Sequence, residues 1–195
     1  MKMSQVALEG RHILMEPLEE RHRAAFLEAV ATGPEIFRWY TTWYRTPEQH
    51  IQLFEEQMAE CHKGARMAFV TLDRATRRLV GGSSYVAISP EHHRLEIGST
   101  WIIPEYQRTY VNTEAKLLQL TDCFERLGCN RVELKTDSFN TKSQQAMLRL
   151  GCKQEGTHRR HMVCEDGRIR DSVYFSIISD EWPEVRQRLT DRLSR

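Results

Sequence analysis

A segment near the middle of the chain combines a strand, a proline stop and a helix start, an arrangement that suits phosphate. The apolar run Leu95–Ile103 ends at Pro104, and after a short polar loop a helical pattern extends from about Asn112 to Leu127. A helix N-terminus offers free backbone N–H groups and the positive end of the helix dipole to an anion. The glycine patterns of P-loops and of dinucleotide-binding folds are absent from the sequence, so neither fold is indicated.

The same strand carries a carboxylate that could move a proton. Glu96 and Gly98 are two residues apart, so their positions share one face of the strand. A carboxylate there could act as a general base through water if burial raises its pKa. The alternative, a glutamate that faces solvent or an arginine, is equally compatible with the pattern.

An aromatic segment lies between the first two expected helices and is the best candidate for contact with an organic ligand. Its four aromatic residues are Trp39, Tyr40, Trp43 and Tyr44. Such rings could clamp a peptide end or an apolar amine, and they could equally be packing residues of the core.

Composition limits the classes of protein that need to be considered. Apolar residues make up 40% of the 195 residues and the net charge is +1, so the chain can bury a core and lacks an overall basic field for nucleic acid. The longest uncharged stretch, Leu79–Pro90, is too short to cross a membrane. The five cysteines form no C-x-x-C pair, and no metal site is expected. We therefore expect a soluble, cytoplasmic protein without a metal.

The order of the expected elements places these candidates on one domain that spans residues 1–195. A βαβ crossover between Leu95 and Asp137 implies one parallel strand pair. The fold class is α+β, or mixed α/β, with a central, mostly antiparallel sheet and helices on both faces. In chain order, strands are expected at 13–18, 67–72, 79–88, 95–103, 131–137, 153–163 and 170–178, and helices at 19–30, from 47, 112–127, 141–150 and from 182.

Two helices have recognisable ends. Thr46 followed by Pro47 is typical of an N-cap and first helical position, and Gly128 is typical of a helix end. In the helix that starts at Pro47, the buried stripe is predicted to consist of Ile51, Phe54, Met58 and Cys61.

Three landmarks in this order and spacing resemble the GNAT acetyltransferases, in particular the RimJ/RimL-like branch that acetylates ribosomal-protein N-termini. The resemblance extends from Arg11–Leu18 to Asp180–Pro183. The landmarks are Pro104–Lys116, the pair Asn140–Ser143 and Leu150–Gly151, and the hairpin that contains Glu155–Gly156, Asp166–Gly167 and Asp171–Tyr174. The resemblance implies a single GNAT domain that uses acetyl-CoA as co-substrate.

The resemblance also assigns residues to the two substrates. Backbone groups of Trp101, Ile102 and Ile103 would pair with the pantetheine arm, and Asn140 would bond the arm from the other side. Ser143 would assist the departing thiolate, and Lys142 would meet a phosphate. The loop that would bind the pyrophosphate comprises Gln107, Arg108, Thr109, Tyr110, Val111, Asn112 and Thr113.

Two departures from the family pattern concern cofactor binding and proton donation. Tyr110 and Asn112 occupy positions where the family has glycines, so a side chain could narrow the approach to the pyrophosphate. Met147 stands where many members have the tyrosine that protonates the thiolate, which leaves Ser143 as the candidate.

The resulting hypothesis is transfer of an acetyl group from acetyl-CoA to a primary amine, with Glu96 as the base. A protein or peptide N-terminus is the preferred acceptor, and the wall of its groove would be the aromatic segment. The alternatives are a small-molecule amine, another acyl-CoA such as succinyl-CoA, and a non-catalytic CoA-binding sensor. The resemblance leaves a homodimer open beside a monomer.

Overall fold

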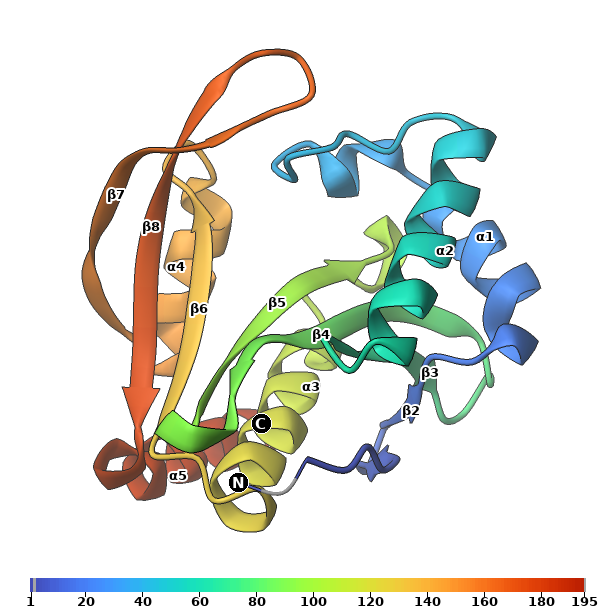
Figure 1. Cartoon of the computed structure of the whole chain (residues 1–195). Helices are drawn as coiled ribbons and strands as arrows, with labels where there is room; N and C mark the ends of the chain where they lie inside the picture. Colours follow the sequence, from blue (N-terminus) through green and yellow to red (C-terminus); the bar gives the residue numbers. More distant parts are fainter. Residues whose placement is uncertain (2, 195) are drawn as a thin grey trace.

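One mixed sheet organises the chain, and its two halves diverge (Figure 1). The computed structural model describes Met1 and residues 3–194. The 8-stranded sheet has the order β1-β2-β3-β4-β5-β6-β8-β7, and the β5–β6 pair is parallel whereas every other neighbouring pair is antiparallel. The strands are β1 (Leu8–Glu9), β2 (Ile13–Pro17), β3 (Met67–Asp73), β4 (Leu79–Ser89), β5 (Arg94–Ile102), β6 (Arg131–Asp137), β7 (Lys153–Val163) and β8 (Ile169–Ile178).

Helices cover both faces of this sheet. The helices are α1 (Arg23–Ala31), α2 (Pro47–His62), α3 (Tyr110–Thr121), α4 (Thr141–Leu150) and α5 (Trp182–Leu193). α1 and α2 pack together on one face, whereas α3 packs on the other face with α5, which also contacts α4. The α+β class, the single parallel pair and the helices on both faces are confirmed.

Local signals set the start of α2 where the sequence predicts it. Thr46 caps α2 in a reciprocal capping box with Gln49, and Pro47 is the first helical residue.

The helix predicted at 112–127 has different bounds. α3 starts two residues earlier, because Thr109 serves as its cap, and it ends at Thr121. A π-helical segment, Asp122–Arg126, continues it. Gly128 follows that segment with φ 71°, a left-handed conformation that glycine reaches without a steric penalty.

The predicted buried stripe of α2 is only partly correct. Phe54 is buried, but Ile51 is 39% exposed. The helix turns the neighbouring positions inward instead, and it buries His50, Leu53, Phe54 and Gln57. Two of these side chains are polar, so a search for apolar periodicity alone selects a face that is rotated away from the real one.

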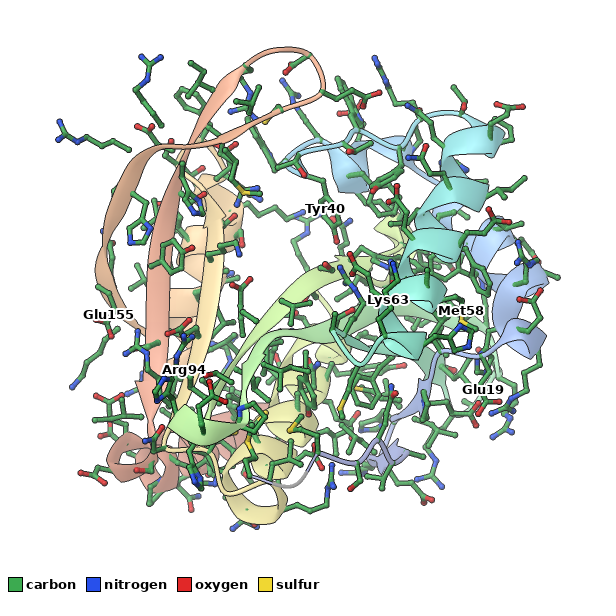
Figure 2. The ribbon with its side chains drawn as sticks, in the orientation of Figure 1. Glu19, Tyr40, Met58, Lys63, Arg94 and Glu155 are labelled. Atoms are coloured by element: carbon green, nitrogen blue, oxygen red, sulfur yellow. The ribbon has the colours of Figure 1, made fainter. Side chains whose placement is uncertain are left out.

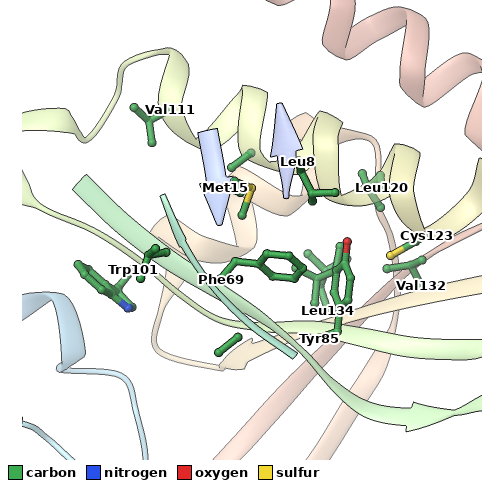
Figure 3. Close-up of a cluster of buried hydrophobic side chains, with 14 of the residues drawn as sticks. Leu8, Met15, Phe69, Tyr85, Trp101, Val111, Leu120, Cys123, Val132 and Leu134 are labelled. Atoms are coloured by element: carbon green, nitrogen blue, oxygen red, sulfur yellow. The ribbon is translucent and has the colours of Figure 1, made fainter. Parts of the chain in front are cut away.

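The main core lies between the sheet and α3. Figure 3 shows Phe69 and Tyr85 from β3 and β4 beside Leu120 of α3 and Cys123 of the π-helical segment that follows α3. The Tyr85 hydroxyl donates to Asp122 Oδ2 at 3.0 Å, which satisfies this buried polar group. Trp101 of β5 lies on the opposite face, where its ring packs 5.3 Å from Phe26 of α1.

The parallel strands β5 and β6 separate after a short contact. They are paired at Arg94, Leu95 and Glu96, and the rest of β5 continues without a pairing to β6. Ser99 adopts φ 49° in an irregular part of the β4–β5 register, which bends β5 further. The three strands β6, β8 and β7 therefore form an arm that stands apart from α2 (Figure 1).

Among the described residues, no helix is long and apolar enough to cross a membrane. Residues 1 and 3–194 also contain no cluster of three His, Cys, Asp or Glu side chains with metal-site geometry.

Candidate active site

The loop before α3 forms the helix N-terminus that the sequence indicates. Arg108 makes the turn in a left-handed conformation, φ 64°, and the Thr109 hydroxyl accepts from Val111 N at 3.3 Å. The side chain of Tyr110 engages the β3–β4 turn, where its hydroxyl donates to Asp73 Oδ2 at 2.5 Å. Asn112 and Thr113 are half-buried in the first turn. The hydroxyl of Tyr110 is thus held by Asp73, and the centroid of its ring lies 4.8 Å from that of His12.

Gln107 connects this loop to β5 and to α4. Its Nε2 donates to Ile102 O at 3.0 Å, and its Oε1 accepts from Lys142 Nζ at 2.6 Å. Asn140 caps α4, because its Oδ1 accepts from Ser143 N at 3.1 Å. The structure therefore brings the loop, the end of β5 and the start of α4 together at the mouth of the strand separation.

The three backbone positions assigned to pantetheine differ in what they can offer. Trp101 contributes its side chain to the core. Ile103 is not a free donor, because its N–H donates to Val80 O at 3.0 Å. Ile102 O accepts from Gln107, so it lies on the edge of β5 away from β4. Strand alternation predicts that Ile102 is the one of the three whose N–H and C=O both face the separated strands.

Glu96 is buried at the point where β5 and β6 separate. Only 4% of the residue is exposed, and its Oε2 accepts from Lys135 Nζ on β6 at 2.8 Å. A buried carboxylate needs such a partner. Its face also carries Gly98, where an added Cβ would lie 3.0 Å from Glu96 Oε1.

Lys135 was not among the residues predicted from sequence, although a signal for it exists. β6 alternates buried Val132, Leu134 and Thr136 with a charged set on the other face. That charged face includes Lys135, which pairs with Glu96, and Asp137, which pairs with Arg168.

The arm carries a partly buried charged cluster close to the Glu96–Lys135 pair. Asp137, which is fully buried, accepts from Arg168 Nη2 at 2.8 Å, and its Oδ2 lies 4.0 Å from Arg170 Nε. Burial lowers the pKa of His161 first, and the positive charges of Lys135, His158 and Arg170 lower it further. These cations therefore disfavour the protonated form of the His161 imidazole.

The aromatic segment and the tip of the β7–β8 hairpin enclose a cavity of about 400 Å³. Trp39, Tyr40 and Trp43 line it, opposite Phe139 and Arg168. In Figure 2 the labelled Tyr40 lies between the arm and the helices α1 and α2. Two contacts close the top, since Glu165 N donates to Thr41 O at 2.8 Å and Arg170 Nη1 donates to Trp39 O at 3.2 Å.

Tyr44 does not line this cavity. It is 7% exposed, its ring packs 5.7 Å from Phe37, and its hydroxyl donates to Glu56 Oε2 at 3.0 Å. The prediction that all four aromatic residues face an acceptor therefore needs correction, because Tyr44 is a packing residue. Ser143 is half-buried in the first turn of α4, below Asn140.

A comparison with protein families decides what this arrangement belongs to. Residues 12–153 match the family described as "Acetyltransferase (GNAT) domain". The chain belongs to the GNAT acetyltransferases. It is 25% identical over 172 residues to "Uncharacterized N-acetyltransferase YoaA" of Bacillus subtilis (strain 168), a match that covers 88% of this chain and 96% of that protein.

Solved GNAT structures share the fold over nearly the whole chain. A structure described as a putative acetyltransferase from T. thermophilus is 34% identical, with a TM-score of 0.88 that covers 99% of this chain and 100% of that one. Mycobacterium smegmatis RimJ, solved in complex with CoA-disulfide, has a TM-score of 0.76 at 21% identity and covers 92% of this chain and 88% of its own. The second likeness concerns the fold alone.

This membership makes the protein an acetyltransferase enzyme of a family that uses acetyl-CoA. The geometry fits that substrate in two respects. The β5 edge near Ile102 is exposed by the strand separation, and the α3 N-terminus follows that edge directly in the chain. The predicted recognition of the GNAT family is confirmed.

Proposed function

We propose that the protein transfers an acetyl group from acetyl-CoA to the α-amino group at a protein or peptide N-terminus. The observation that carries the proposal is the buried Glu96 carboxylate at the separation of β5 and β6. The aromatic-lined cavity between the aromatic segment and the hairpin tip is the candidate acceptor site. The resemblance of the three sequence landmarks to the RimJ/RimL-like branch supports the choice of an N-terminal acceptor.

Acetyl-CoA would be held by groups from three segments. Backbone N–H groups of the first turn of α3 and the side chain of Arg108 would meet the pyrophosphate. Ile102 would pair with the pantetheine arm, and Asn140 would donate to it through Nδ2, since its Oδ1 caps α4. Lys142 would exchange its contact with Gln107 for a phosphate oxygen.

The chain's own residues would move the protons. Bound acetyl-CoA supplies an activated acyl group as a thioester. Glu96 would take the proton that the amine loses as its nitrogen bonds to the acyl carbon, directly or through one water. The hydroxyl of Ser143 would donate a hydrogen bond to the sulfur as the carbon–sulfur bond breaks. Backbone N–H groups would stabilise the negative charge that develops on the carbonyl oxygen.

Proton affinity favours an α-amine over a lysine side chain as acceptor. An α-amine has a pKa of about 7.7–8.0, against about 10.4 for lysine. A much larger fraction of the α-amine is therefore neutral near pH 7. Glu96, as a carboxylate, is a weak base and would be adequate for the first acceptor and poor for the second.

A competition experiment tests this assignment. Release of free CoA thiol is measured with acetyl-CoA and equimolar peptides, one with a free N-terminus and no lysine, the other N-blocked with one lysine. Faster acetylation of the free N-terminus is expected. Faster acetylation of the blocked peptide, a polyamine or an aminoglycoside would contradict the acceptor class. Light scattering on the same sample decides between a monomer and the homodimer that the resemblance allows.

A further inference from the structure

Arg170 is a buried cation that lacks a close carboxylate partner. Only 7% of the residue is exposed. A guanidinium has five N–H groups, and among the described residues Arg170 donates to Ser172 Oγ at 3.1 Å and to Trp39 O at 3.2 Å, both uncharged. Burial lowers the pKa of Arg170, whereas the charges of Asp137 and Glu96 act in the opposite direction.

The nearest carboxylate is already in use. Asp137 forms its short contact with Arg168 at 2.8 Å and accepts from Phe139 N at 2.9 Å, while Arg170 lies 4.0 Å away. Glu96 is paired in turn with Lys135. Three cations, Lys135, Arg168 and Arg170, thus stand against two carboxylates, Glu96 and Asp137. The lining of the neighbouring cavity adds Arg38 and Arg45 against Glu165 and Asp166, so one positive charge remains in excess.

Two further unused donors belong to residues that line the neighbouring cavity. Arg168 Nη1 and the Tyr40 hydroxyl are both buried and have no hydrogen-bond partner within the described part of the chain. Both residues line that cavity. Burial raises the pKa of Tyr40, so its hydroxyl stays protonated and can donate near neutral pH. Buried donors without acceptors are costly unless a ligand supplies the acceptors.

We propose that Arg170, Arg168 and Tyr40 form a binding site for a carboxylate that one of the two reactants carries. A carboxylate supplies the missing negative charge and matches the planar guanidinium fork. The carboxylate can belong to the acceptor, as an acidic residue after the reacting amine, or to the acyl chain, as in succinyl-CoA. This site rests on the proposed acyl transfer beside Glu96, because Arg170 lies 4.0 Å from Asp137, two residues along β6 from the Lys135 that pairs with Glu96.

The alternative is a purely structural role for Arg170 as a link between β8 and the aromatic segment. A structural link would affect all substrates equally, whereas a carboxylate site affects only those that carry the group. The ratio of kcat/KM between matched charged and neutral substrates therefore separates the two roles.

The experiment uses two matched pairs and four variants. In the acceptor arm, acetyl-CoA is combined with C-terminally amidated peptides that begin Ala-Asp or Ala-Asn. In the donor arm, the Ala-Asn peptide is combined with succinyl-CoA or with the neutral butyryl-CoA. The test variants are Arg170→Lys and Tyr40→Phe. Their controls are Arg188→Lys on α5 and Tyr44→Phe, whose hydroxyl is bonded to Glu56 outside the cavity.

One arm is expected to show a preference of about 10- to 100-fold for the charged substrate, the range of one charge-assisted contact. Arg170→Lys should remove most of that preference, Tyr40→Phe should reduce it, and the two controls should retain it. Ratios near one in both arms of the wild type, or a preference that survives in both test variants, would overturn the carboxylate site while leaving acyl transfer intact.

Failure of the proposed function gives a different result. If no pair supports transfer, the acyl-transfer proposal is contradicted, and the site is then judged by thermal stabilisation alone. The Ala-Asp peptide or succinyl-CoA should raise the Tm of the wild type more than its neutral counterpart, and equal shifts would count against the site. Tyr40→Phe removes one oxygen atom only, so it decides the question if Arg170→Lys does not fold.

Discussion

At the scale of single residues, two neighbouring carboxylates differ in their cation partners. Glu96 on β5 and Glu133 on β6 are cross-strand partners in the last paired position before the strands separate. Glu96 is paired with Lys135 alone and its side chain is 5% exposed, whereas Glu133 is paired with both Arg94 and Arg131 and its side chain is 15% exposed. The single cation partner and the deeper burial distinguish the candidate base Glu96 from the structural ion pairs of Glu133.

Glu96→Gln should lower kcat by about 10²–10⁴-fold, the typical loss for a general base. The affinity for acetyl-CoA should stay nearly unchanged, because the role concerns the amine proton. Glu133→Gln is the matched control and should retain kcat. Steady-state kinetics together with calorimetric binding of acetyl-CoA measure both quantities. Wild-type turnover in Glu96→Gln between pH 6 and 9 would assign Glu96 a structural role.

Lys116 of α3 gives a second prediction at this scale, one that concerns stability. It is 4% exposed, and its Nζ bonds to Thr100 Oγ1 at 2.8 Å and to Gln119 Oε1 at 3.0 Å. Burial lowers its pKa to about 7, whereas an unfolded lysine titrates near 10.4. Between these two pKa values, Lys116 is protonated in the unfolded chain and neutral in the folded one. Its contribution therefore makes the free energy of unfolding rise as pH rises, and fall as pH falls toward 7.

The difference between wild type and Lys116→Met isolates this contribution. Between pH 7 and 8.5 the wild type should gain up to about 1.4 kcal/mol per pH unit relative to the variant. The exposed Lys63→Met serves as control and should follow the wild type. Urea unfolding at three pH values measures the free energy of unfolding of each protein. If this free energy changes with pH equally in the wild type and in Lys116→Met, Lys116 stays protonated in the folded protein.

At the scale of elements, the sequence predicts most of the fold because strands and helices follow apolar periodicity and end signals. It misses β1, whose two residues are too few to form a pattern. It also misses the polar burials of α3, since Glu114 is buried by accepting from the backbone N–H groups of Arg11 and His12. Such burials depend on tertiary partners about a hundred positions away, which periodicity within one element does not reveal.

The candidate site residues also divide into those that a local pattern reveals and those that depend on distant contacts. The helix N-terminus and Glu96 are visible as motifs and strand positions. The contact between Arg170 and Trp39 joins residues 131 positions apart, so it appears only once the arm and the aromatic segment are folded together. For that reason the sequence assigned Tyr44 to the acceptor and overlooked Arg168, Arg170 and Lys135.

The α3 N-terminus allows charge and backbone conformation to be separated at Arg108. Arg108→Ala and Arg108→Gly both remove the guanidinium and should weaken acetyl-CoA binding by about tenfold or less, the effect of one exposed contact. Arg108→Gly should be about 1 kcal/mol more stable than Arg108→Ala, because φ is 64° at this position. Calorimetry and thermal unfolding measure the two effects. Unchanged affinity in both variants would assign the phosphate to backbone N–H groups alone.

Asn140 combines a helix cap with the proposed contact to pantetheine. Asn140→Ser keeps a cap acceptor and loses the amide donor, whereas Asn140→Ala loses both. Both variants should bind acetyl-CoA more weakly, but only Asn140→Ala should lose about 1 kcal/mol of stability. If Asn140→Ser binds acetyl-CoA as tightly as the wild type, the residue is a helix cap only.

At the scale of the whole molecule, the arm and the α1–α2 half are joined by β5–β6 pairing at one end and by a clasp at the other. In the clasp, the Glu165 carboxylate accepts hydrogen bonds from Trp43 N at 3.2 Å and from Gln49 Nε2 at 3.3 Å. Its backbone N–H donates to Thr41 O at 2.8 Å. The clasp consists of exposed polar contacts, which are individually weak, so it should open far more readily than the sheet.

Glu165→Ala should therefore loosen the clasp without destabilising the core. Hydrogen exchange should speed up in residues 39–45 and 164–168 and stay unchanged in β3 and β4. KM for the acceptor should rise several-fold while KM for acetyl-CoA changes little, because the clasp borders the cavity and not the α3 loop. Glu28→Ala, at an exposed position of α1 outside the cavity lining, is the control. Equal exchange in both variants and an unchanged acceptor KM would mean that the two halves are held in place by the sheet alone.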